Sequence, residues 1–385
     1  MSTRVEPGLT KTLEKFGLID NQACYHCGNC TAICNLTEGD RLFPRRAIKY
    51  AQLGLKDKLD QSVEPWLCYY CGDCSKECPR DANPGEQMMA LRRYLTSIYD
   101  WTGLSFKFYT SKAWELGAVL FVAALVVAVF VVLHAIFPGH YLRELATAPD
   151  GSRYVPLNAF APMEYVHRFD WGLAGVLATF LLSNVLRMYF KIVRSDRNLR
   201  VPLLLYLRKA GTLGVHFATQ MRLLKCDRKF GFWFMHVFFV TGYLTMLTLV
   251  VVLLPWFQID SEGINWTTYF GYYATAALLY GCVYCMVGRV RKKETHHEFS
   301  HFSDWMFLVL LLLTVVTGIL VHVLRYYLKL TDATYAMYVL HLAVSVPMLV
   351  IEVPFSKWAH LAYRPVALYL ADVRSAAREL QGGSQ

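Results

Sequence analysis

Eight of the eleven cysteines fall into two runs of identical spacing, C-x2-C-x2-C-x3-C. The first run is Cys24, Cys27, Cys30 and Cys34, and the second is Cys68, Cys71, Cys74 and Cys78. Thiolates at this spacing are typical ligands of [4Fe-4S] clusters, with three cysteines holding one cubane and the fourth reaching the other. The spacing therefore predicts two clusters. We expect the first ligand set to be Cys24, Cys27, Cys30 and Cys78, and the second to be Cys68, Cys71, Cys74 and Cys34.

Two other uses of these cysteines fit less well. A structural zinc ion needs four ligands, typically as two separated C-x2-C pairs, and would leave half of the cysteines unused. Disulfides are disfavoured in a reducing cytoplasm.

Apolar residues recur at helical spacing around Ile48 and again from Met88 to Ile98, which predicts a helical ferredoxin rather than one built on β-hairpins. Arg41, near the first run, is expected to be a solvated charge.

Four histidines lie in or beside long apolar stretches: His236, His322, His341 and His360. An ionisable residue inside a membrane helix indicates a functional site. His341 and His360 are 19 residues apart, roughly 28 Å along a helix, so they cannot bind the same iron. The direction of the apolar stretches puts His236 at the depth of His360, and His322 at the depth of His341.

Two stacked pairs of histidines are the pattern of a dihaem b cytochrome. We expect an inner haem on His236 and His360 and an outer haem on His341 and His322. His134 or Met246 could replace His322. No C-x2-C-H motif occurs, so the haems would be bound without thioether links. The alternative for each histidine is a hydrogen bond between helices.

The chain that must position these groups is divided in composition. It has 385 residues, of which 55% are hydrophobic and 18% charged, and its mean hydropathy is +0.30. The first 100 residues hold 26 of the charged residues, and six long stretches free of Asp, Glu, Lys and Arg follow. Each stretch is long enough to cross a bilayer. The predicted spans are about 116–138, 170–192, 231–256, 265–288, 304–327 and 335–356.

The distribution of charged residues predicts which side of the membrane the head and the loops lie on. The first residues contain no apolar region of the kind that marks a signal peptide, so we expect the cysteine-rich head to stay in the cytoplasm. Residues 191–230 carry ten Lys or Arg against two acidic residues, as loops on the inner side usually do. Six spans then place both termini in the cytoplasm.

The head has 13 basic and 13 acidic residues, a balance that argues against nucleic-acid binding. His296, His297 and His301 are expected to be solvated in an inner loop.

These patterns resemble known families. The head, from Cys24 to Pro79, resembles the C subunit of heterodisulfide reductases, an α-helical ferredoxin. The body resembles the cytochrome b (gamma) subunit of respiratory nitrate reductases, through the residues around His236 and the stretch from Pro354 to His360. That family has a second histidine ten residues after the first, where this chain has Met246, and it lacks the extra first span.

The fusion of such a head to such a body is similar to the C subunits of the quinone-interacting membrane-bound oxidoreductase (Qmo) complexes of sulfate-reducing microbes. The expected fold is all-α, with a ferredoxin domain at 1–105 and a six-helix membrane cytochrome b domain at 106–385. The resemblance implies a subunit of a quinone-interacting oxidoreductase in the cytoplasmic membrane. It also implies two cytoplasmic flavin and iron-sulfur partner subunits, and electron exchange between menaquinone and adenylylsulfate reductase in sulfate respiration.

Two other functions stay open. One is a membrane subunit of a heterodisulfide reductase-type complex, although the chain has no adjacent pair of cysteines with which to cleave a disulfide itself. The other is a membrane anchor without haem, whose histidines only pack helices. The spacing of ligands does not reveal the quinone site or the direction of electron flow, because potentials depend on burial and hydrogen bonds.

Overall fold

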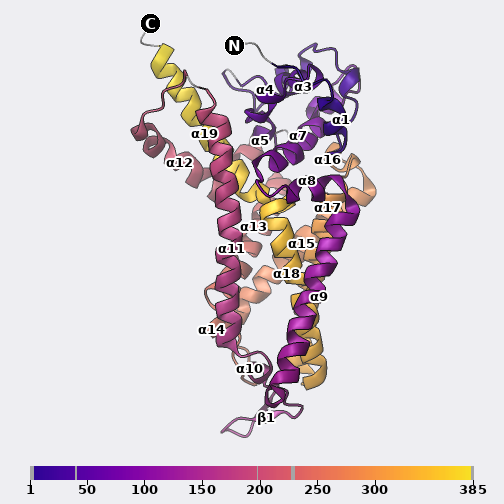
Figure 1. Ribbon diagram of the computed structural model, residues 1–385. Coiled ribbons are helices and arrows are strands. Elements are labelled where there is room, and N and C mark those ends of the chain that lie inside the picture. Colours follow the sequence, from indigo (N-terminus) through magenta and orange to yellow (C-terminus); the bar gives the residue numbers. More distant parts are fainter. Residues whose placement is uncertain (1–3, 40, 197, 227–229, 383–385) are drawn as a thin grey trace.

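The protein is almost entirely helical, with a head of short helices at one end of six long ones (Figure 1). The computed structural model describes residues 4–39, 41–196, 198–226 and 230–382. The head comprises α1 (Leu9–Glu14), η1 (Asn21–Ala23), α2 (Asn29–Ala32), α3 (Arg45–Gln52), α4 (Lys56–Asp60), α5 (Glu64–Leu67), α6 (Asp73–Lys76), α7 (Pro84–Tyr99) and α8 (Leu104–Thr110). The expected all-α fold is confirmed.

Six helices within the described residues are long and apolar enough to cross a membrane. They are α9 (Lys112–Ile136), α11 (Met163–Tyr189) with η3 (Phe190–Arg194), α13 (Phe230–Val251), α15 (Trp266–Arg291), α17 (Phe302–His322) with η5 (Val323–Tyr327), and α18 (Thr331–Phe355). Apolar side chains such as Phe121 on α9 and Leu182 on α11 face outward, which suits a lipid environment. The chain thus has the helices of a multi-pass membrane protein.

Shorter elements connect the spans. They are η2 (Pro138–His140), β1 (Ala146–Thr147), β2 (Arg153–Tyr154), α10 (Leu157–Phe160), α12 (Leu203–Thr219), η4 (Met221–Lys225), α14 (Leu254–Phe257), α16 (Thr295–Glu298), η6 (Lys357–Ala359) and α19 (His360–Gly382). Strands β1 and β2 pair antiparallel, with Ala146 opposite Tyr154. They lie at the end of the bundle opposite the head (Figure 1). The start of α1 and the end of α19 both lie at the head end.

The two cysteine runs fold alike. Gly28 and Gly72 each adopt a left-handed conformation, with φ of 91° and 89°, and start the short helices α2 and α6. A residue with a Cβ would be strained in this conformation. Cys30 and Cys74 follow the two glycines at the same position and are both buried. The sequence repeat is therefore also a structural repeat.

The helix α18 ends within one residue of the predicted end of span six. Its last residue is Phe355, Ser356 leaves helical geometry with φ −130° and ψ −140°, and η6 leads into α19. Pro354 is the penultimate residue of α18 and cannot donate a backbone hydrogen bond. His360 therefore lies just beyond the end of span six, as expected, and it is also the first residue of the new helix α19.

A single hydrophobic core joins the head to the body. Trp66 and Tyr99 of the head pack against Tyr363 of α19, with ring centroids 5.4 Å and 5.6 Å from it. Arg41 is buried and forms a 2.6 Å ion pair with Asp372 of α19. The expectation that Arg41 would be solvated was wrong, because α19 covers it. The division at residues 105 and 106 stays a prediction, and α8 crosses it.

Candidate functional site

The structure brings together the four cysteines of the first expected ligand set. Cys24 follows η1, Cys30 lies in α2 and Cys78 lies just beyond α6. The thiols of Cys24, Cys27 and Cys78 all interact with Cys30 electrostatically. Burial, together with these neighbours, raises the pKa of the Cys30 thiol to about 11. Such a thiol keeps its proton until a bound metal displaces it.

The second set is also gathered in one place. Cys34, from the first run, interacts electrostatically with Cys68 and Cys71, and Cys74 interacts with all three. These four side chains line a small hollow, together with Cys226. The amide of Tyr70 donates to Sγ of Cys68 at 3.3 Å, a type of contact that tunes cluster potentials. Four thiols around one hollow are a donor set that suits a [4Fe-4S] cluster.

Cys226 was missed at the sequence level. It lies just beyond η4 in the body and is buried. A hydrogen bond with its side chain lowers the pKa of the Cys71 thiol below the usual value. The residue is more than 140 positions away from the cysteine runs and belongs to no motif, so spacing carries no signal for it.

A cavity of about 230 Å³ lies between the head and the body; we call it the interface cavity. The head contributes Tyr69 and Tyr70, which also line the hollow of the second ligand set. The body contributes His236 from α13 and His360 from α19. The cavity therefore connects the surroundings of the second cysteine set with the inner histidine pair.

The two inner histidines are oriented alike. Nδ1–H of His236 donates to the side-chain oxygen of Gln220, and Nδ1–H of His360 donates to the carbonyl of Lys357 at 2.5 Å. Metal-binding histidines are usually fixed by such a bond from the other ring nitrogen. Burial, followed by the nearby Arg364 guanidinium, lowers the pKa of His360 well below its ordinary value. The ring is therefore neutral, as a metal ligand must be. His236 also acts electrostatically on His360, so these two imidazoles are the residues that would hold a b haem if one is bound here.

The outer histidines are not brought together in the same way. Nδ1 of His341 is hydrogen-bonded to the hydroxyl of Thr317 at 2.9 Å, whereas Nε2 of His322 is 2.9 Å from the hydroxyl of Tyr272 on α15. Thr317 precedes His322 by five residues, or roughly 7 Å along the helix. The two rings thus contact different neighbours at different depths.

The two alternative partners of His341 are also engaged. His134 bonds through both ring nitrogens to the carbonyls of Phe130 and Phe160, at 2.8 Å and 3.1 Å. Met246 packs beside a hydrophobic cluster formed mainly by α17 and α18. Each would have to leave these contacts to bind an outer haem, so the structure favours none of the three as the second ligand.

Two partly buried arginines connect the second cysteine set to the start of α19. Arg92 of α7 donates to the carbonyl of Cys68, and Arg364 donates to the same carbonyl at 3.4 Å. Burial, followed by the charge of Arg364, lowers the pKa of Arg92 to about 9. Arg364 lies one helical turn beyond His360. The contacts thus join the expected cluster and haem sites across one wall of the interface cavity.

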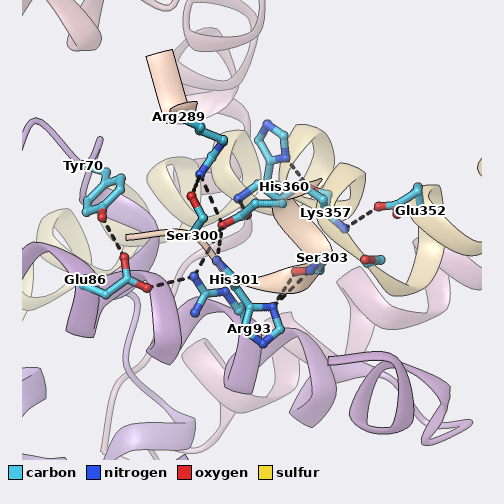
Figure 2. A network of polar contacts seen from close by, with 12 residues as sticks. Tyr70, Glu86, Arg93, Arg289, Ser300, His301, Ser303, Glu352, Lys357 and His360 are labelled. Atoms are coloured by element: carbon cyan, nitrogen blue, oxygen red, sulfur yellow. Dashed lines mark hydrogen bonds and ion pairs between the residues drawn. The ribbon is translucent and has the colours of Figure 1, made fainter. Parts of the chain in front are cut away.

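A polar network crosses the head–body boundary beside the interface cavity (Figure 2). The hydroxyl of Tyr70 donates to Glu86 at 2.7 Å, and Arg93 pairs with Glu86 at 2.9 Å and with Asp304 of α17 at 3.7 Å. Asp304 also pairs with Arg289 at 3.8 Å and with Lys357. One carboxylate of the body thus faces three cations, one of which belongs to the head.

The histidines between α15 and α17 were expected to be solvated, and this was wrong, because none of the three is exposed and His296 lines the interface cavity. His297 is 5% exposed and packs where Gly288 leaves room for its ring. His301 caps the start of α17, and its backbone N–H donates to Asp304 at 3.1 Å. Both residues lie under the head, which the sequence alone could not place.

Comparisons with known proteins bear on the head. Residues 17–83 match the 4Fe-4S dicluster domain family. This match supports iron-sulfur clusters in the head. The chain is 31% identical over 98 residues to a protein of Archaeoglobus profundus described as like the heterodisulfide reductase C subunit, a match that covers 25% of this chain and 52% of the relative. It is also 34% identical over 92 residues to the iron-sulfur C subunit of a CoB–CoM heterodisulfide reductase from Methanopyrus kandleri, covering 24% and 46%.

The body goes beyond these similarities. The chain spans about half the length of the curated relatives that it matches, and no solved structure matches it. The family match ends at residue 83, before the first of the six long helices. The comparisons support an iron-sulfur component of an oxidoreductase complex that transfers electrons.

Proposed function

We propose that the protein is the membrane electron-transfer subunit of a quinone-interacting oxidoreductase. Electrons would pass between menaquinone in the bilayer and cytoplasmic flavin and iron-sulfur partners, through two b haems and two [4Fe-4S] clusters. The haems and clusters move one electron at a time, whereas quinone chemistry moves two. In this proposal the head faces the cytoplasm, with both termini on that side.

The interface cavity carries this proposal. Tyr69 and Tyr70, next to the second cysteine set, line one part of it, and His236 and His360 line another. Arg364 extends from the helix that His360 begins and reaches the carbonyl of Cys68. A haem at the histidines and a cluster at the cysteines would thus lie on two sides of one cavity, an arrangement that suits direct electron transfer.

An optical spectrum of the dithionite-reduced, full-length protein tests the haem assignment. We expect a b-type α-band, and we expect His236→Ala and His360→Ala each to remove one haem and leave the other. His216→Ala is the matched control, since this half-buried histidine on α12 lies outside both pairs. Absence of the α-band in the wild-type protein, or retention of both haems in both variants, would contradict the proposal.

The outer haem is proposed to bind His341, with His322 as its expected partner. Three single variants decide the partner: His322→Ala, His134→Ala and Met246→Leu. The variant that loses the outer haem identifies the ligand. If all three keep it while His341→Ala loses it, the second ligand is another residue, and the pairing with His322 is wrong.

Purification of the native complex from membranes tests the partners. The resemblance to Qmo subunits supports two flavin and iron-sulfur subunits and electron exchange with adenylylsulfate reductase. The matches to heterodisulfide reductase C subunits support a second candidate, the membrane subunit of a heterodisulfide reductase-type complex. Flavoproteins as co-purifying subunits favour the first function, and subunits that reduce disulfides favour the second.

A further inference from the structure

Two carboxyl groups are buried together where the head meets the membrane helices. Glu115 lies in the first turn of α9 and Glu352 in the last turn of α18, and both are 0% exposed. The hydroxyl of Ser356 donates to Oε1 of Glu115 at 3.3 Å, and the backbone N–H of Lys357 donates to Oε2 of Glu352 at 3.0 Å. The remaining oxygens, Oε2 of Glu115 and Oε1 of Glu352, have no hydrogen-bond partner among the described residues.

The groups around this pair do not neutralise two negative charges. Lys357 acts electrostatically on Glu352, but its ammonium already forms an ion pair with Asp304. Asp304 itself adds a further negative charge, which acts on Glu115. Tyr109 of α8 is buried, and both carboxylates act on it. The pair is therefore flanked by a phenol, a hydroxyl and an ion pair that is already formed.

Two carboxylates in such a place cannot both be ionised, because burial and mutual repulsion each disfavour the second charge. They must keep at least one proton between them, as the paired carboxyls of other buried dyads do. The unpartnered oxygens are the atoms to which that proton can bind.

The pair also lies directly behind the interface cavity. Three residues line the cavity and also lie beside the two carboxyls. Ser356 and Lys357 donate hydrogen bonds to them, and Tyr109 interacts with both electrostatically. Lys357 further accepts the Nδ1–H of His360 through its carbonyl. The backbone of Lys357 therefore links His360 to Glu352 through two hydrogen bonds. A change of charge at His360 would change the electrostatic potential at Glu352.

We propose that Glu115 and Glu352 form a proton-binding site whose occupancy follows the redox state of the group held by His236 and His360. When one electron reaches that group, one proton from cytoplasmic water binds to the carboxyl pair. When the electron leaves, the proton returns to the water. The pair thereby compensates the charge of an electron in a low-dielectric region, where an uncompensated charge is costly. This inference rests on the proposed function, because it needs a redox group at the two histidines.

Infrared spectroscopy of the full-length protein tests the site. We expect the C=O stretch of a protonated carboxylic acid in the oxidised wild-type protein at neutral pH, and its loss in the E115Q/E352Q double variant. Glu164→Gln is the control, since Glu164 is a well-exposed carboxylate on α11. Each single variant should lower the pH at which the remaining carboxyl ionises. An identical band in the wild-type protein and the double variant would overturn the proposal.

A redox titration tests the coupling separately. With one proton bound per electron, the potential of the inner haem should fall by about 59 mV for each pH unit in the wild-type protein, and it should lose this dependence in the double variant. An equal slope in both proteins would overturn the coupling. If the wild-type protein bound no haem, the proposed function would fail and the coupling with it. The carboxyl band of the oxidised protein would still report on the proton held by the pair.

Discussion

At the scale of single residues, the cysteines and histidines differ in what fixes them. Each cysteine run is short, so its loops and the glycines at positions 28 and 72 determine where the thiols lie. Each inner histidine depends on a partner from a different segment, such as Gln220 for His236. Local spacing is therefore a strong signal for the clusters and a weaker one for the haems.

Cys226→Ala should lower the reduction potential of the cluster at the second cysteine set. Its side chain hydrogen-bonds Cys71, and a donor to a ligand sulfur stabilises the more negative, reduced cluster. A bond of about 1 kcal/mol corresponds to roughly 40 mV for a one-electron couple. A redox titration monitored by electron paramagnetic resonance measures the shift. Cys282→Ala, a buried cysteine within α15, is the control and should leave the potential unchanged. Equal potentials in both variants would refute the role of Cys226.

At the scale of elements, the close contact between α13 and α15 positions His236, one of the two inner histidines. Gly242 of α13 lies so near α15 that a Cβ on it would be 2.6 Å from Cβ of Ala277. Small residues at such crossings let helices approach closely in membranes. His236 lies on the same helix, six residues earlier, so the spacing of α13 and α15 sets its place in the cavity.

Gly242→Val should push α13 away from α15 and weaken haem binding at His236. Overpacking of this kind typically costs about 1–3 kcal/mol. Thermal unfolding and the haem content of the purified variant measure the effect. Gly231→Ala, on the same helix but with open space around it, should behave as the wild-type protein does. Equal haem content and unfolding temperature in the Gly242→Val protein would show that this contact does not position His236.

Tyr363→Ala should loosen the packing of α19 on the head. Its ring contacts both Trp66 and Tyr99, and truncation of a buried aromatic residue to alanine costs about 3–5 kcal/mol. We expect a lower unfolding temperature and faster loss of the cluster absorbance on heating. Tyr363→Phe keeps the ring and is expected to retain most of the stability. A Tyr363→Ala protein as stable as the wild type would mean that α19 does not hold the head.

The sequence predicted the helical head and the six long helices, because both follow from local spacing and runs of apolar residues. It placed the end of span six at about residue 356, close to the observed end at Phe355, but it did not predict the helix α19 that follows. It also missed the contacts of Cys226 and the meeting of Glu115 with Glu352. These pairs are far apart along the chain, and only tertiary packing brings them together.

At the scale of the whole molecule, the head and the body share one hydrophobic core and one network of charges. Asp304 of the body faces Arg93 of the head and Arg289 and Lys357 of its own domain. Breaking a buried ion pair on one side leaves the other charges uncompensated. The network thus makes one carboxylate in α17 part of what holds the head on the body, beside the Arg41–Asp372 ion pair and the packing of Tyr363.

Asp304→Asn should therefore destabilise the seating of the head, by about 3–5 kcal/mol. Limited proteolysis of the purified protein should cut the segment between α7 and α9 faster than in the wild type. Asp332→Asn, whose partner is Tyr141 at the far end of the bundle, is the control and should show wild-type cleavage. Unchanged cleavage in the Asp304→Asn protein would indicate that apolar packing alone seats the head.

The position of α19 also bears on how the protein is made. The core of the head includes Ala359, Tyr363 and Leu370, which leave the ribosome after all six spans. The cysteine runs are synthesised before the six spans, yet the core beside them is completed by residues synthesised after those spans. The head can therefore pack fully only after the membrane helices have been made. A chain cut before α19 would leave the apolar face of the head uncovered beside its cysteines.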